Sequence, residues 1–161
     1  MSPVNNGSQR ASSAQQSNEH STGRNLPLLL LQARERVISH FRPVLNKYRV
    51  TEQQYRILRA LDMNGPLEPR SIGEICHISS PSLAGVLARM EEVCLVARQR
   101  MPQDQRRQLV SLTPDSRALL RQMWPHIAAV YRKLDAQLGK DLNAEVYRAL
   151  EGLLERLDTP G

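Results

Sequence analysis

The chain has 161 residues, enough for one domain with a hydrophobic core, and its formal net charge is +6. This basic balance favours a polyanionic partner, while an aromatic content of 4% is too low for the stacking platforms that bind single-stranded nucleic acid. No apolar run of about 18 residues, signal segment, CxxC motif or metal-ligand spacing is present, so we expect a cytoplasmic protein without metal or cofactor and with Cys76 and Cys94 reduced.

The N-terminal part of the chain changes character near residue 25. Residues 1–25 are rich in Ser, Asn and Gln and have almost no large apolar side chains, so we expect a disordered tail. Residues 26–48 are expected to form a helix, because one face repeats every three or four residues. That face carries Leu30, Arg34, Val37, Phe41 and Leu45. Pro43 lies inside this pattern and should kink the helix or end its regular hydrogen bonding.

Two shorter helices follow. Residues 51–54, Thr-Glu-Gln-Gln, form a capping box that opens a helix ending near Gly65. The buried side of this helix is expected to carry Tyr55, Leu58 and Leu61. Pro69 begins a third helix that runs to about His77. Its inward-facing residues are expected to be Ile72 and Ile75.

Residues 79–113 are the most informative segment. Ser80 is a hydroxyl cap, and Pro81 follows at the first helical position. One face of this helix is apolar, with Leu83, Val86, Leu87 and Met90. The opposite face is small and polar, with Ser79, Ser80, Ser82, Ala84 and Gly85. Two strands, at 95–101 and 108–112, are expected to flank a basic loop at 102–107.

A slim helix of this kind fits the DNA major groove, and a basic loop beside it can reach the minor groove. The segment therefore predicts a winged helix-turn-helix within a mainly helical α+β fold. The alternative is a surface helix packed on an ordinary hairpin. The ordered combination of cap, small face, hairpin and Asp-x-Arg tip favours DNA binding.

The C-terminal part is expected to be helical. Thr113-Pro114 repeats the cap and proline, and a long apolar stripe runs to Leu138 before Gly139. A last helix is expected at 143–157, capped by Asn143, with Leu142 and Tyr147 spaced as a hydrophobic staple. The apolar faces of 26–48 and 114–157 must be buried, and the same helices of a second copy are the natural partner. A monomer with a helical cap is the alternative.

Several motifs resemble the signature of the MarR family of bacterial regulators. They are Pro81-Ser82-Leu83, Leu87-x-Arg89-Met90-Glu91, Asp104-x-Arg106 and Val110-x-Leu112-Thr113. Three others resemble the subgroup that regulates homoprotocatechuate (4-hydroxyphenylacetate) catabolism: Leu31-Gln32-Ala33-Arg34-Glu35, Phe41-Arg42-Pro43 and Thr51-Glu52-Gln53-Gln54. The resemblance implies one domain over residues 26–160. It divides this domain into dimerisation helices at 26–48 and 114–157 and a DNA-binding lobe at 49–113.

The resemblance also implies a dimeric repressor that binds a palindromic operator in double-stranded DNA and is released by a small phenolic or heteroaromatic carboxylate. The DNA-binding residues it implies are Ser79, Ser80, Pro81, Ser82, Gly85, Arg89, Asp104, Arg106 and Arg107. Arg89 is expected at a phosphate and Arg106 in the minor groove, steered by Asp104. Two positions depart from the family: Val93-Cys94 replaces a common Asp-Gly turn, and Pro125 lies within the long helix.

A buried aromatic carboxylate needs a cationic partner, because an unpaired buried charge is costly. Arg34 lies on the apolar face of the first helix, so we expect it to clamp the carboxylate, with His40 and Arg56 as helpers. For each of the three, the alternative is a side chain whose stem packs against the protein while its polar head reaches a glutamate or water.

The residues also bear on three other functions. Oxidation of Cys76 or Cys94 would make the chain a redox-sensing regulator, although only His77 lies beside either thiol in the sequence. An architectural DNA-coating protein shares the basic charge but gives no reason for an arginine on an apolar face. An enzyme is not expected, because the four histidines are scattered and no catalytic or phosphate-binding motif is present.

Overall fold

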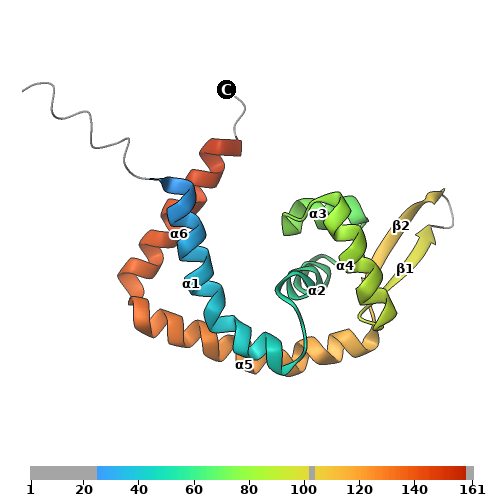
Figure 1. Cartoon of the computed structure of the whole chain (residues 1–161), viewed down its shortest axis with the longest axis horizontal. Coiled ribbons are helices and arrows are strands. Elements are labelled where there is room, and N and C mark those ends of the chain that lie inside the picture. The colour runs from blue at the N-terminus through green and yellow to red at the C-terminus, as the bar shows by residue number, and fades with distance from the viewer. Residues whose placement is uncertain (1–24, 102–103, 159–161) are drawn as a thin grey trace, which may run out of the picture. The chain divides into compact units, whose positions relative to one another are not determined.

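The computed structural model describes residues 25–101 and 104–158 (Figure 1). Six helices and one hairpin follow the order α1 Leu26–Lys47, α2 Glu52–Asn64, α3 Pro69–Cys76, α4 Ser80–Glu92, β1 Val96–Met101, β2 Asp104–Leu112, α5 Pro114–Leu138 and α6 Lys140–Asp158. The mainly helical winged-helix fold predicted from the sequence is confirmed. Among the described residues, no helix is long and apolar enough to cross a membrane.

The chain divides into two compact units, with the boundary between Ser39 and His40 inside α1. The tail expected at 1–25 falls almost wholly outside the described residues. In the second unit, α2, α3 and α4 lie beside the β1–β2 hairpin, and α5 leads from the hairpin to α6 (Figure 1). The assignment of dimerisation helices and a DNA-binding lobe stays a prediction.

The first helix and the capping box form as expected. Helix α1 continues through Pro43 to Lys47, so the proline does not end it. At the start of α2, the Gln54 amide donates to Thr51 Oγ1 at 3.2 Å, and the Thr51 amide donates to Gln54 Oε1 at 2.8 Å. Leu58 and Leu61 are buried, whereas Tyr55 is half-buried.

Helix α3 buries Ile72 and Cys76, which are four residues apart and share one face. The expectation that Ile75 faces the core is wrong: its side chain is 48% exposed, because a helix of two turns has only one narrow buried face. The turn to α4 passes through His77 in the left-handed region, with φ of 48°. Gly73 of α3 eases this turn, since an added Cβ would make a tight contact of 3.1 Å with the Ile78 carbonyl oxygen.

Helix α4 begins one residue earlier than its predicted cap implies. Ser79, not Ser80, is the N-cap, and its hydroxyl donates to Ser82 Oγ at 3.0 Å. The apolar face is confirmed, because Leu83, Val86, Leu87 and Met90 are all buried. After α4, Cys94 adopts a φ of 57°, the left-handed conformation in which glycine carries no steric cost.

The hairpin is longer than expected on its second strand. Strand β2 begins at Asp104, so Asp104, Arg106 and Arg107 lie on a strand and not in a loop. The pairing is regular from Val96↔Leu112 to Arg100↔Gln108 and then shifts to Met101↔Asp104. This irregularity lets β2 pair while it carries extra residues, a bulge that alternation in the sequence does not reveal.

The C-terminal helices adjoin at Gly139, whose φ is 77°. Thr113 caps α5 as predicted, and Leu120, Met123 and Ile127 are buried. Helix α6 already begins at Lys140, so the cap assigned to Asn143 is wrong. Because Asn143 lies within the helix, its Nδ2 instead donates to Asp135 Oδ1 at 2.8 Å. No residue of α6 is buried, so its apolar stripe remains exposed.

The end of α1 packs on α5 within the second unit. The rings of Phe41 and Tyr131 meet edge to face, with centroids 5.0 Å apart. The Tyr48 hydroxyl donates to the Gln122 carbonyl at 3.0 Å, and Lys47 Nζ lies 3.2 Å from His126 Nε2. These contacts fix residues 40–48 against the middle of α5.

Candidate DNA interface and effector cavity

The first turn of α4 presents the small polar surface that the sequence predicts. Ser79, Ser80, Pro81 and Ser82 are exposed, and Gly85 is half-exposed one turn further on. The core holds α4 by its opposite face, so these side chains are free to meet a groove edge. The structure thus brings five of the predicted DNA-binding residues together at the N-terminal end of one helix.

Arg89 extends this surface toward α2. Its Nη1 lies so close to Gly85 that a Cβ there would be 3.5 Å away. Arg89 also borders a hollow of about 210 Å³ at the start of α2, lined by Thr51, Glu52, Gln53, Gln54 and Val86. A DNA phosphate at this hollow would meet both the guanidinium and the positive end of the α2 dipole.

Arg107 is the predicted wing residue whose side chain the structure describes. Its Nε donates to Glu68 Oε1 at 2.7 Å, and its Nη2 contacts the same oxygen. The side chains of Asp104 and Arg106 lie outside the described residues, although their backbone belongs to β2. The ion pair predicted between Asp104 and the wing arginine therefore stays a prediction.

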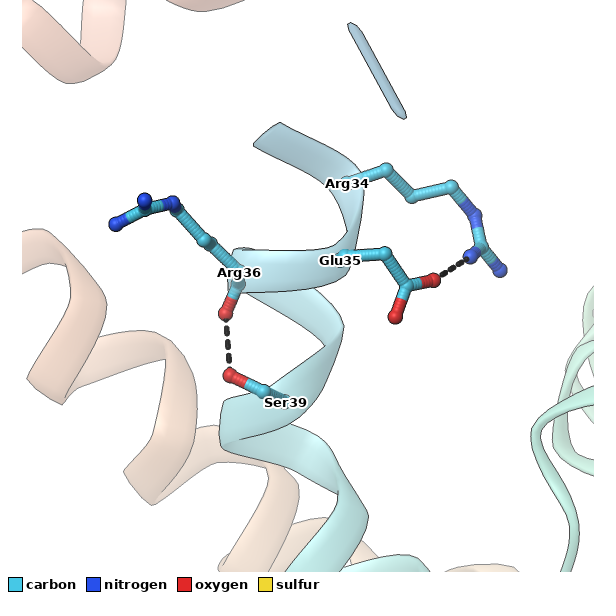
Figure 2. A network of polar contacts seen from close by, with 4 residues as sticks. All are labelled: Arg34, Glu35, Arg36 and Ser39. Carbon is cyan, nitrogen blue, oxygen red and sulfur yellow. Dashed lines mark hydrogen bonds and ion pairs between the residues drawn. The ribbon is translucent and has the colours of Figure 1, made fainter. Parts of the chain in front are cut away.

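Arg34, the predicted effector clamp, is exposed on α1. Its Nη1 donates to Glu35 Oε1 at 2.8 Å, and its side chain is 47% exposed. Figure 2 shows Arg34 turned onto Glu35 while Arg36 points to the other side of the helix, above the Ser39 hydroxyl that donates to the Arg36 carbonyl. Arg34 belongs to the first unit, whereas His40 and Arg56 belong to the second.

The second unit contains a cavity of about 600 Å³ between α2, α3 and α5. Its lining combines aromatic rings, apolar side chains and two arginines: Tyr55, Arg56, Arg59, Ala60, Met63, Asn64, Ile75, Cys76, Trp124 and Tyr131. His40 does not line it. Burial raises the pKa of the Tyr55 hydroxyl, so this phenol stays protonated and is able to donate a hydrogen bond.

Arg56 is only partly available in this cavity. Its Nη1 donates to the Cys76 carbonyl at 2.8 Å, which closes the end of α3. Its Nε is buried and has no hydrogen-bond partner among the described residues. Arg56 therefore helps to hold α3 against α2 and still carries one unsatisfied donor.

Arg59 is a candidate effector residue that the sequence reasoning missed. Its guanidinium lies 5.6 Å from the centre of the Trp124 ring, and its Nη1 donates to Asp62 at 2.7 Å. It lines both the main cavity and a neighbouring hollow of about 390 Å³ that also contains Arg117 and Arg121. Arg59 follows Tyr55 by four residues, a spacing that places the two on one side of α2 and was a usable signal.

The two cysteines differ in environment. Cys76 is buried, and burial raises the pKa of its thiol, although Arg56 opposes part of this effect. Cys94 is exposed, and its carbonyl accepts a hydrogen bond from Thr113 Oγ1 at 2.7 Å. Within residues 25–101 and 104–158, no cluster of His, Cys, Asp and Glu could hold a metal ion.

Comparison with known proteins points to one family. The model of the MarR family matches residues 50–107. The homoprotocatechuate degradative operon repressor of Escherichia coli is 38% identical over 130 residues, which cover 81% of this chain and 85% of that protein.

Solved structures agree with the sequence comparison. NadR in complex with 4-hydroxyphenylacetate has a TM-score of 0.69 and 34% identity, covering 83% of this chain and 92% of its own. The repressor CouR bound to a DNA duplex has a TM-score of 0.75 and 26% identity, covering 85% of this chain and 96% of its own.

Proposed function

We propose that this chain, which belongs to the MarR family of DNA-binding transcription regulators, is a dimeric repressor released from a palindromic operator by a small aromatic carboxylate. Members of this family are transcription factors and not enzymes. The observation that carries the proposal is that one compact unit holds both the exposed face of α4 and a cavity with arginines and aromatic rings. Helix α2 borders the hollow beside Arg89 at its start and the cavity along its length.

The DNA-binding part rests on α4 and the hairpin. We assign the major groove to Ser79, Ser80, Pro81, Ser82 and Gly85, the phosphate backbone to Arg89, and the minor groove to Arg106 steered by Asp104. Exposed small side chains at the start of a helix allow its backbone to approach base edges closely. The repressor CouR, a structural relative, was solved on a DNA duplex.

The effector part rests on the main cavity. An aromatic acid needs apolar walls for its ring and a cation for its carboxylate. Tyr131 and Trp124 supply the walls, Arg59 supplies the cation, and Tyr55 supplies a hydroxyl for a phenolic oxygen. Two relatives match this chemistry, since one is named for homoprotocatechuate degradation and the other was solved with 4-hydroxyphenylacetate. We therefore propose Arg59 as the clamp, with Arg34, His40 and Arg56 as the competing candidates.

The dimer part rests on α6. Leu142, Val146, Leu150 and Leu154 are between 40% and 59% exposed, so the helix presents an apolar stripe with no cover in the described chain. An apolar stripe of this length is stable in water only when a partner covers it. A second copy supplies that cover and also places two DNA-binding lobes on a two-fold operator.

A binding titration on the protein's own upstream DNA tests the proposal. Fluorescence anisotropy of a labelled fragment should show tight binding, and phenolic and heteroaromatic acids should release the fragment. The matching amides should be far weaker, because they lack the charge that Arg59 would bind. Release by amides and acids alike would contradict a carboxylate clamp, and failure to bind any upstream fragment would contradict the repressor.

A further inference from the structure

Two contacts join β2 to the segment between α2 and α3. Leu67 and Val110 exchange two backbone hydrogen bonds, of 3.0 Å from the Leu67 amide and 2.8 Å from the Val110 amide. Three residues before Val110 on β2, Arg107 donates from Nε to Glu68 Oε1 at 2.7 Å. Adjacent residues, Leu67 and Glu68, therefore hold the hairpin at two points. The anchored segment is the start of α3, which leads into the turn before α4.

Glu68 occupies an unusual place for such a contact. It is the N-cap of α3, with φ of −69° and ψ of 149°, and its side chain makes no capping hydrogen bond. A side-chain oxygen at this position ordinarily accepts from a backbone N–H of the first turn. In this protein, the Glu68 carboxylate instead accepts from Arg107.

Stability gives little reason for this arrangement. The side chains of Arg107 and Glu68 are 55% and 33% exposed, and ion pairs this open to water contribute little to the stability of the fold. The pair matters more for geometry than for stability, because it fixes the position of β2 relative to α3. Helix α3 is in turn fixed close to α4, where Gly73 allows the Ile78 carbonyl to approach. The position of the hairpin is thus fixed relative to the groove-facing helix α4.

We propose that Glu68 and Arg107 are positioning residues of the wing. Their ion pair sets where the hairpin meets DNA relative to α4, and it keeps the Arg107 charge on Glu68 and off the phosphates. This inference rests on the proposed DNA-binding function and revises one part of it, since the sequence assigns Arg107 to DNA. Arg106 remains the wing residue for the minor groove.

The salt dependence of operator binding tests where the Arg107 charge lies. Each cation that neutralises a phosphate contributes about 0.9 to the slope of log K against log salt. Arg107→Gln should therefore lower the slope by less than Arg106→Gln does, and only as far as the displaced wing weakens the Arg106 contact. Arg106→Gln, the matched control on the neighbouring residue, should lower it by about 0.9 per subunit. Glu68→Gln should raise it by up to about the same amount, because Arg107 loses this carboxylate and its charge can turn toward a phosphate.

Hydroxyl-radical footprinting tests the positioning itself. Arg107→Gln and Glu68→Gln should each weaken protection of the flanking minor groove while protection at the α4 contact persists. Operator affinity should fall roughly 2- to 12-fold for Arg107→Gln, the cost of ordering a wing segment on binding. Exchanging the two charges, Glu68→Arg with Arg107→Glu, should restore the flanking protection.

Two results would overturn the inference. One is a slope that Arg107→Gln lowers as much as Arg106→Gln does, since Arg107 would then be a phosphate contact. The other is a flanking footprint that neither single variant changes. If the hairpin does not bind DNA at all, the result would differ. Wild type would then show no flanking protection, and Arg106→Gln would have the same slope of log K against log salt as wild type. The positioning role would fall with it.

Discussion

At the scale of single residues, the proposed effector site depends on which arginine binds the carboxylate. Arg59 lies in the cavity wall over Trp124, whereas Arg34 pairs with Glu35 on the exposed side of α1. Arg59→Ala should keep operator binding and lose release by an aromatic acid. A typical effector coupling is about 1–3 kcal/mol, so the acid would shift operator affinity 5- to 150-fold in wild type and hardly at all in the variant.

Anisotropy titrations with and without the acid measure this coupling. Arg132→Ala is the control, because Arg132 is exposed on α5 and does not line the cavity. Arg34→Ala decides between the two candidates. Loss of release in Arg34→Ala together with normal release in Arg59→Ala would return the clamp to the residue that the sequence favours.

The two thiols give a second prediction at this scale. Only the thiolate reacts with alkylating agents and peroxides, and the pKa of Cys76 is raised by burial. At pH 8 Cys76 is therefore mostly the thiol, in a site that reagents reach poorly, while Cys94 is exposed. Iodoacetamide followed by peptide mass spectrometry should show Cys94 modified much faster than Cys76. Faster modification of Cys76 would favour the redox-sensing alternative.

At the scale of elements, the turn after α4 carries a testable strain. Cys94 has a φ of 57°, and a side chain in this region costs about 1–2 kcal/mol relative to the right-handed conformation. Cys94→Gly removes that cost but adds chain entropy to the unfolded state, so we expect a net gain of about 0.5–1 kcal/mol. Urea unfolding would measure it. Val93→Gly is the control, because Val93 has a φ of −96° and should only lose stability.

The elements also show what the sequence could and could not predict. The capping box of α2 and the buried face of α4 depend on residues within a few positions of one another, and both were predicted correctly. The start of β2 at Asp104 and of α6 at Lys140 depends on pairing and packing with other elements, so local patterns placed both too late. Arg59 was missed for the same reason, since its proposed role depends on Trp124 from α5, far along the chain.

At the scale of the whole molecule, the unburied α6 predicts self-association. Light scattering should give about twice the chain mass of 18.2 kDa.

Leu150 is 41% exposed, so Leu150→Glu leaves the core of the chain intact but puts a charge into the proposed interface. In a two-fold dimer the substitution is present in both subunits. Losing two buried leucines costs about 3–6 kcal/mol of association free energy. The variant should be monomeric at micromolar concentration. It should bind the palindrome weakly, because each subunit then binds its half-site without the other. Ala144→Glu adds the same charge on the opposite side of α6 and should remain a dimer. A wild-type monomer that binds the palindrome tightly would show that α6 is covered in some other way.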